Sequence, residues 1–144
     1  MFLTIPADIS VGGIMPESGP LVLIVDDSGE SRELCRHVLQ KAGYRTQVAS
    51  SGVEALSQIA ANLPDLVVLD LIMPELDGFT TTHRLRANPR THELPILVLS
   101  AMSTDTVPAV RRAGANGFCA KPIDAHRLLA EVQRLFPLAS RKAS

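Results

Sequence analysis

The chain has 144 residues, of which 46% are hydrophobic and 20% are charged, and its formal net charge is -1. This length suits one domain with a sizeable core, and the composition excludes an intrinsically disordered chain. The near-neutral charge gives no electrostatic reason to expect nucleic acid or an acidic membrane surface as a partner, and no apolar run is long enough to predict a transmembrane helix. Cys35 and Cys119 lack metal-binding or redox spacing, so we interpret them as core residues in a reducing cytoplasm.

The first twenty residues differ in composition from the rest of the chain. Several glycines and prolines argue against regular structure, and the segment lacks the basic and apolar regions of a signal peptide. We therefore expect a flexible N-terminal extension over residues 1–20, a globular domain over residues 21–137 and a short tail over residues 138–144. A start at Met15 is an alternative that the sequence leaves open.

From residue 21 onward, short apolar segments alternate five times with amphipathic ones. Apolar and β-branched runs predict strands, and apolar residues at helical spacing predict helices. In chain order we expect strand 21–25, helix 28–42, strand 44–49, helix 51–62, strand 66–70, helix 79–87, strand 94–100, a fourth helix ending near residue 113, strand 117–121 and helix 124–136. This alternation predicts an α/β fold with a parallel sheet and helices on both of its faces.

Local signals refine three of the expected helices. In the first two, the apolar spacing predicts inward faces, formed in the first helix by Leu34, Cys35, Val38, Leu39 and Ala42 and in the second by Val53, Leu56, Ile59 and Leu63. Ser51 and Glu54 have the spacing of a capping box at the start of helix 51–62. Pro108 cannot donate a backbone hydrogen bond, so the fourth helix should either start late or be kinked.

Charged and hydroxyl side chains stand at the carboxyl ends of the expected strands. The most apolar strand runs into Asp70, the first strand precedes Asp26 and Asp27, the fourth ends in Ser100 and the fifth in Lys121. In a parallel sheet these ends meet at one edge, where ligands bind. Neighbouring carboxylates repel one another, and a hard divalent cation such as Mg²⁺ relieves that repulsion. Each residue alone has an ordinary structural explanation, but their joint placement indicates a phosphate-receiving site with an aspartate nucleophile.

Four motifs follow one another along the chain. They are Asp26-Asp27, Leu66 to Asp70 followed by Met73-Pro74 and Gly78, Ser100-Ala101, and Ala113-Gly114-Ala115 followed by Phe118, Lys121 and Pro122. Together they resemble the receiver domain of bacterial two-component response regulators, of the CheY-like, single-domain type. The resemblance covers about residues 21–137 and implies the flavodoxin-like, doubly wound (βα)5 fold of that family.

The resemblance implies a phosphoacceptor and a metal site. Asp70 would accept the phosphoryl group and contribute to binding Mg²⁺, for which Mn²⁺ can substitute. Asp27 would bind the metal directly and Asp26 mainly through water. The backbone carbonyl of Ile72 would be a further ligand.

The resemblance also implies how the phosphoryl group is held and sensed. Lys121 would contact it, and the peptide bond from Lys121 to Pro122 would be cis. Ser100 and Phe118 resemble the switch pair of the family, in which the hydroxyl moves toward phosphate and the aromatic ring turns inward. The family often has Thr and Tyr at these two positions. Because Phe118 lacks a hydroxyl, we expect a less sharply defined output state.

Two apolar residues predict a fairly long-lived phosphoryl group. Ile72 and Met102 lie two positions beyond the acceptor and the switch serine, where family members often carry polar residues that position water. Apolar side chains at these positions should hinder attack by water on the phosphoryl group.

The implied function is a phosphorylation-activated switch and not an enzyme, with at most slow self-dephosphorylation. Phosphate would come from a sensor histidine kinase or a histidine phosphotransfer protein in the cytoplasm. Because no output domain is present, we expect the signal to leave by protein contact, through the fourth helix, fifth strand and last helix, without nucleic acid or membrane. Arg111, Arg112 and Arg127 could steer a partner there, although a solvated basic face is the simpler explanation.

Three alternative functions compete with this interpretation. An aspartyl phosphohydrolase usually needs a second acid two residues after its nucleophile, where this chain has Ile72. A flavin carrier on the same fold would be disfavoured because Asp26 and Asp27 repel a phosphate. A phosphate-independent docking module on the receiver fold remains, although the intact acids and lysine argue against it.

Overall fold

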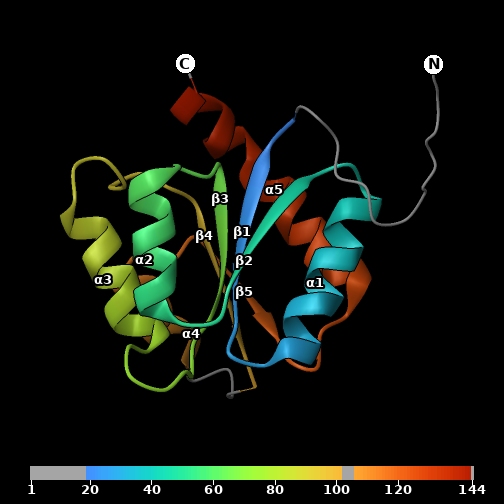
Figure 1. Cartoon of the computed structure of the whole chain (residues 1–144), viewed down its shortest axis with the longest axis horizontal. Coiled ribbons are helices and arrows are strands. Elements are labelled where there is room, and N and C mark those ends of the chain that lie inside the picture. Colours follow the sequence, from blue (N-terminus) through green and yellow to red (C-terminus); the bar gives the residue numbers. More distant parts are fainter. Residues whose placement is uncertain (1–18, 102–105, 144) are drawn as a thin grey trace.

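The structure is a computed structural model that describes residues 19–101 and 106–143, with side chains up to Phe136. It contains one five-stranded parallel sheet in the order β2-β1-β3-β4-β5 (Figure 1). Residues 1–18 of the expected N-terminal extension, and Met102, lie outside the described residues. The strands are β1 (Leu21–Val25), β2 (Arg45–Ala49), β3 (Leu66–Asp70), β4 (Ile96–Ser100) and β5 (Gly117–Ala120).

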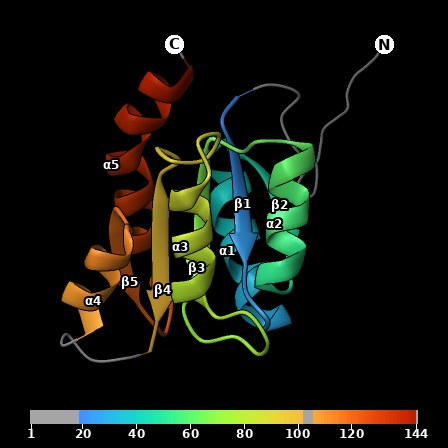
Figure 2. The ribbon, with the colours of Figure 1, turned by 90° about the vertical axis from the view of Figure 1, so that its left-hand side faces the viewer.

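The helices cover both faces of the sheet, as the alternating pattern predicts. One face carries α1 and α5, and the other carries α2, α3 and α4 (Figures 1 and 2). The bounds are α1 (Gly29–Lys41), α2 (Gly52–Ala61), α3 (Gly78–Ala87), α4 (Thr106–Ala113) and α5 (Ala125–Ala143). This is the flavodoxin-like arrangement of five strand–helix units, so the predicted fold class is confirmed.

The sheet is buried on both sides because successive side chains of each strand point to opposite faces. In β1, Leu23 and Val25 pack with residues of α2, α3 and α4, whereas Val22 and Ile24 pack with residues of α1 and α5. All five residues of β3 and of β4 are buried. Because both faces of these central strands are buried, their sequences are uninterrupted apolar runs.

Polar caps fix where α2 and α5 start. The Ser51 hydroxyl accepts a hydrogen bond from the Glu54 backbone N–H, but the Glu54 carboxylate accepts from Ser50 instead of completing a capping box with Ser51. In α5, Asp124 Oδ1 accepts from the backbone N–H groups of His126 and Arg127. Each cap satisfies N–H groups that the first helical turn leaves without partners.

Two expectations about prolines have different outcomes. Pro108 is the third residue of α4, where a missing N–H costs nothing, so the helix starts at Thr106 with the proline in its first turn. The last helix, by contrast, does not end near Phe136: it continues through Pro137 to Ala143. That expectation was wrong because a proline late in a helix removes one hydrogen bond without forbidding the helical backbone.

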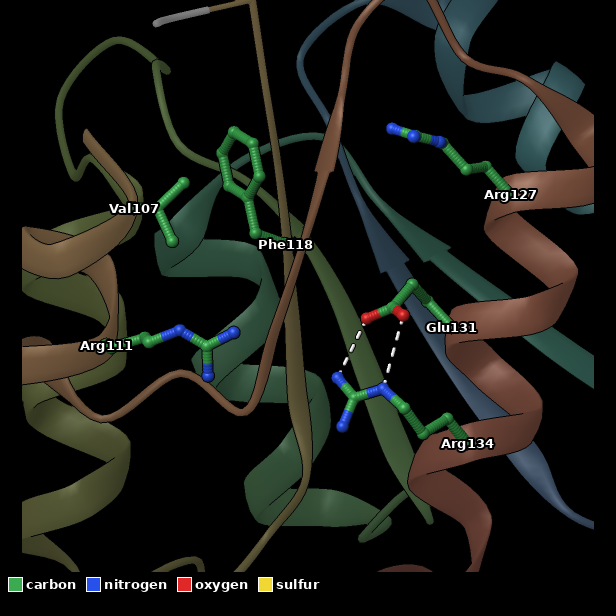
Figure 3. A pocket seen from close by; sticks show the side chains of 6 residues that line it. All are labelled: Val107, Arg111, Phe118, Arg127, Glu131 and Arg134. Carbon is green, nitrogen blue, oxygen red and sulfur yellow. Dashed lines mark hydrogen bonds and ion pairs between the residues drawn. The ribbon is translucent and has the colours of Figure 1, made fainter. Parts of the chain in front are cut away.

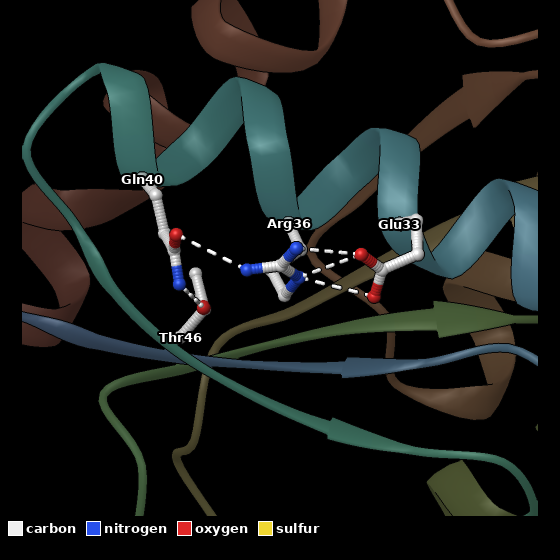
Figure 4. A network of polar contacts seen from close by, with 4 residues as sticks. All are labelled: Glu33, Arg36, Gln40 and Thr46. Atoms are coloured by element: carbon white, nitrogen blue, oxygen red, sulfur yellow. Dashed lines mark hydrogen bonds and ion pairs between the residues drawn. The ribbon is translucent and has the colours of Figure 1, made fainter. Parts of the chain in front are cut away.

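The predicted inward faces of α1 and α2 are confirmed at Cys35, Val38, Leu39 and Ile59, which are buried, but are wrong at Leu34, Ala42 and Val53, which are exposed. Leu34 is 44% exposed and Val53 is 56% exposed. The buried positions are Cys35, Val38 and Leu39 in α1 and Gly52, Ala55 and Ile59 in α2. The outer side of α1 is polar, and there Arg36 bridges Glu33 and Gln40, whose amide donates to Thr46 on β2 (Figure 4).

No helix in the described parts of the chain is long and apolar enough to cross a membrane. The two cysteines are free and buried in the cluster beneath α1 and α5. Burial raises the pKa of the Cys35 thiol to about 12 and that of Cys119 to about 11, so both stay protonated near neutral pH. Their role as core residues is consistent with this burial.

Candidate functional site

The acidic residues meet at the carboxyl ends of the central strands, at the lower edge of the sheet in Figure 2. Val25 pairs with Leu69 in the β1–β3 register, so Asp26 and Asp70, the next residue on each strand, lie at the same level. Carboxylate oxygens of Asp26, Asp27 and Asp70 all lie within 4.8 Å of one another. The sheet thus brings Asp70 next to the Asp26–Asp27 pair, from which it is far apart in the sequence.

Lys121 completes this cluster from the end of β5. Its Nζ donates to Asp26 Oδ2 at 3.0 Å and lies 3.5 Å from Asp70 Oδ1. The Asp26 side chain is fully buried, and its second oxygen, Oδ1, accepts from the Ser28 backbone N–H at 2.9 Å. Asp26 is therefore fixed on both oxygens, while the lysine sits between two carboxylates.

The environment makes Asp70 a weaker acid than usual. Burial, followed by the negative charge of Asp26, raises the pKa of Asp70 to about 6, although Lys121 opposes this shift. For Lys121, burial favours the neutral form, but the hydrogen bond and charge of Asp26 outweigh it and raise the pKa of the ammonium. Near pH 7 the site therefore holds a charged lysine beside a mostly ionised, poorly solvated Asp70.

The cluster fits a hard divalent cation. Three carboxylates and one ammonium give a formal charge of -3 + 1 = -2 within a few ångströms. Asp26 is buried and fixed, whereas Asp27 is exposed. A site with carboxylate oxygens on one side and solvent on the other suits Mg²⁺, which prefers oxygen ligands and keeps several of its waters.

The other residues singled out in the sequence lie around this cluster. Ser100 is buried at the end of β4, one residue beyond Leu99, which pairs with Asp70. The Lys121–Pro122 peptide bond is cis. Ile72, two residues after Asp70, exposes 61% of its surface beside the site. Phe118 is half-buried on β5 and lies farther along the sheet, between α4 and α5 (Figure 3).

Two contacts at the site were not anticipated from the sequence. Arg32 Nη1 on α1 donates to the backbone carbonyl of Asp26 at 2.8 Å and so holds the turn that carries both N-terminal acids. Gly78 begins α3 so close to β3 that an added Cβ would lie 2.7 Å from the Asp70 carbonyl oxygen. Only glycine allows this approach, which sets the loop between Asp70 and α3 against the site.

Comparison with known proteins identifies this architecture. The family model described as "response regulator receiver domain" matches residues 22–133. The chain belongs to the receiver domain family. Among curated proteins, this receiver domain is 44% identical over 115 residues to the response regulator MprA of Mycobacterium sp. strain KMS, which covers 79% of the chain and 49% of that protein. It is 36% identical over 124 residues to the DNA-binding dual master transcriptional regulator RpaA of Synechocystis sp., covering 85% of the chain and 51% of that protein.

A solved structure agrees with the family assignment. The chemotaxis protein CheY4 of Vibrio cholerae is 33% identical to the chain, with a TM-score of 0.77 over 81% of the chain and 98% of that structure. The chain spans about half the length of RpaA and MprA. Receiver domains are the signalling modules of two-component systems, so phosphorylation-dependent signalling is the class of function to which this chain belongs.

Proposed function

We propose that this receiver domain accepts a phosphoryl group on Asp70 from a phosphohistidine of a sensor histidine kinase or a histidine phosphotransfer protein, in the cytoplasm. The observation that carries the proposal is the placement of Asp70, a buried carboxylate 3.5 Å from Lys121 Nζ and beside two further acids. Ionised at neutral pH but poorly solvated, Asp70 is suited to act as a nucleophile. Neither a membrane nor a nucleic acid is needed for this step.

The proposed transfer balances as a simple displacement. A carboxylate oxygen of Asp70 forms a bond to phosphorus, and the phosphorus–nitrogen bond to the donor imidazole breaks, with the bonding electrons going to the imidazole nitrogen, which takes a proton from solvent water. The product is an acyl phosphate. Lys121 stays protonated and moves toward the phosphoryl oxygens, whose charge it stabilises.

Asp26, Asp27, Asp70 and the Ile72 carbonyl would hold Mg²⁺ (or Mn²⁺) in this site. When bound, the ion offsets the negative charge of the carboxylates and of the incoming phosphoryl group. Arg32 and Ser28 hold the Asp26–Asp27 turn in place through the Asp26 carbonyl and Oδ1. Ser100 would then donate its hydroxyl to the bound phosphoryl group, and Phe118 would respond to that movement.

The readout of the phosphorylated state would involve α4, β5 and α5, where Phe118 lies between the two helices (Figure 3). Phosphorylation would bias two arrangements of this surface, and a downstream protein would bind one of them more tightly. Slow loss of the phosphoryl group, and not turnover of a substrate, would end the signal.

The direct test of the proposed function is intact mass after incubation with acetyl phosphate and Mg²⁺. We expect one added phosphoryl group on the wild-type chain and none on Asp70→Asn or on wild type in EDTA. Asp77→Asn is the matched control, because asparagine caps α3 as well as the exposed Asp77 does. A folded wild-type protein that gains no phosphate with Mg²⁺ present would leave only the phosphate-independent docking module.

The exposed Ile72 provides a prediction about signal lifetime. Its side chain cannot hydrogen-bond a water aligned for attack, so Ile72→Asn should accelerate loss of the phosphoryl group. One hydrogen bond of about 1.4 kcal/mol in the transition state corresponds to on the order of tenfold in rate. The half-life of the phosphorylated mass species measures this effect, with Ile72→Val as the apolar control. Equal half-lives for the asparagine variant and wild type would contradict the prediction.

A further inference from the structure

A groove lies between α4 and α5 with β5 as its floor, and none of its lining residues belongs to the acidic cluster (Figure 3). Its volume is about 400 Å³, enough for a few side chains but not for a folded element. The lining residues are Val107, Arg111, Phe118, Arg127, Glu131 and Arg134. Figure 3 shows Arg111 extending from α4 into the groove, with Glu131 and Arg134 facing it from α5.

The charges in this groove are unbalanced. Arg134 donates to Glu131 at 2.8 Å and to the Asn116 carbonyl at 3.1 Å, so its guanidinium is engaged. Arg111 and Arg127 are exposed, and their guanidinium groups make no hydrogen bond or ion pair with any residue that the structure describes. The groove therefore presents two available guanidinium groups, while its carboxylate is already paired.

The floor of the groove is apolar. Phe118 is half-buried and packs against the core cluster beneath α2, α3 and α4, with part of its ring open to the groove, and Val107 is half-buried beside it on α4 (Figure 3). A ligand that covers this floor gains from burying apolar surface. The two available arginines stand on opposite walls, so a charged ligand would be held from both helices.

We infer that this groove binds an acidic segment of a partner protein, with carboxylates paired to Arg111 and Arg127 and an apolar side chain resting on Phe118 and Val107. Guanidinium groups pair with carboxylates through two parallel hydrogen bonds, which gives direction as well as attraction. A nucleic acid backbone fits less well, because Glu131 faces it and the whole chain carries a net charge of -1. The inference rests on the proposed function, in which this surface is the readout.

A selection of peptides that bind the protein tests which kinds of side chain the groove prefers. A displayed library of random twelve-residue peptides would be selected on the full chain, with and without beryllium fluoride and Mg²⁺ as a phosphoryl mimic. We expect the selected peptides to be enriched in Asp and Glu flanking a large apolar residue. Synthetic versions should bind Arg111→Gln/Arg127→Gln at least tenfold more weakly than wild type.

The matched control is Arg84→Gln/Arg112→Gln, which removes the same charge from exposed positions outside the groove. It should bind the same peptides within about twofold of wild type, because long-range attraction is mostly screened at physiological salt. Three outcomes would each overturn the inference. The selected peptides could lack acidic enrichment, or both double variants could bind them equally weakly. A twelve-nucleotide DNA could also bind the groove more tightly than the acidic peptides do.

Failure of this inference can be told apart from failure of the proposed function. Both double variants should still gain one phosphoryl group from acetyl phosphate, because none of the four arginines lies in the acidic cluster. If acidic peptides bind equally with and without the phosphoryl mimic, the groove chemistry stands and the link to phosphorylation fails.

Discussion

Replacing Lys121 with methionine is expected to slow phosphorylation of Asp70 by about 10² to 10³-fold, the typical cost of losing one preorganised charge or donor at a transition state. Methionine has a similar length and fills the same space without a charge. In the wild-type chain the ammonium lies 3.0 Å from Asp26 and 3.5 Å from Asp70, so no other described cation is placed to stabilise the transferred phosphoryl oxygens as closely. The initial rate of mass gain with acetyl phosphate measures the effect.

The same variant should bind Mg²⁺ more tightly, which separates this prediction from simple damage to the site. Removing the ammonium changes the formal charge of the cluster from -2 to -3, and a more negative site attracts a divalent cation more strongly. Calorimetric titration with MgCl₂ measures the affinity. Lys41→Met, at an exposed lysine in the last turn of α1, is the control and should change neither quantity.

Stability gives a third readout for Lys121→Met. Without its lysine, the carboxylate of the buried Asp26 pairs with no other cation among the described residues in metal-free buffer. Breaking a buried ion pair from one side costs about 3–5 kcal/mol, and the partial exposure of Lys121 should bring the loss to the lower end of that range. Millimolar Mg²⁺ should restore most of this loss by binding to the folded state. Phosphorylation at the wild-type rate, with Mg²⁺ binding intact, would contradict the role proposed for the lysine.

The sheet and the convergence of residues on its edge could be predicted from the sequence because they depend on topology. Once the strands are parallel, residues that follow them meet at one edge wherever the helices pack. Asp26, Asp27, Asp70 and Lys121 therefore required only the assignment of three strand ends. Apolar runs bounded by turn residues specify such ends well, because a fully buried strand tolerates few polar residues.

The edges of a helix's buried face, and contacts that depend on the exact packing angle of a helix, could not be predicted. A helix turns by about 100° per residue, so one position separates the buried Cys35 from the exposed Leu34. The contact from Arg32 to the Asp26 carbonyl requires the packing angle of α1, about which the sequence carries no separate signal.

The groove illustrates the same limit for charges. Glu131 lies four residues after Arg127 and three before Arg134, and both spacings allow an ion pair on a helix. The structure pairs Glu131 with Arg134, whose guanidinium also reaches the Asn116 carbonyl. This second acceptor lies on the loop before β5 and is not visible in the helix pattern. Arg127 is therefore not paired with Glu131. Part of the basic face expected from the sequence lines the groove between α4 and α5.

Replacing Asp70 with asparagine is expected to stabilise the metal-free protein at pH 7 by about 2 kcal/mol. Burial and the charge of Asp26 raise the pKa of Asp70 from 3.8 to about 6, so the ionised carboxylate destabilises the folded state at pH 7. Each unit of pKa corresponds to about 1.36 kcal/mol, and screening by water at this open edge reduces the total. For a domain of this size the gain corresponds to roughly 5–8 °C in Tm, measured by thermal unfolding in EDTA.

The sign of the pH dependence makes this prediction specific. Between about pH 4 and pH 6 the folded state binds a proton on Asp70 that the unfolded state does not, so this residue adds to wild-type stability as the pH falls through that range. The asparagine variant lacks that contribution, and its advantage over wild type should shrink toward zero near pH 4. Glu93→Gln, at an exposed carboxylate, should track wild type at both pH values. If the advantage stayed constant from pH 7 to pH 4, the fold would not raise the pKa of Asp70. The raised pKa could then no longer support the assignment of Asp70 as the nucleophile.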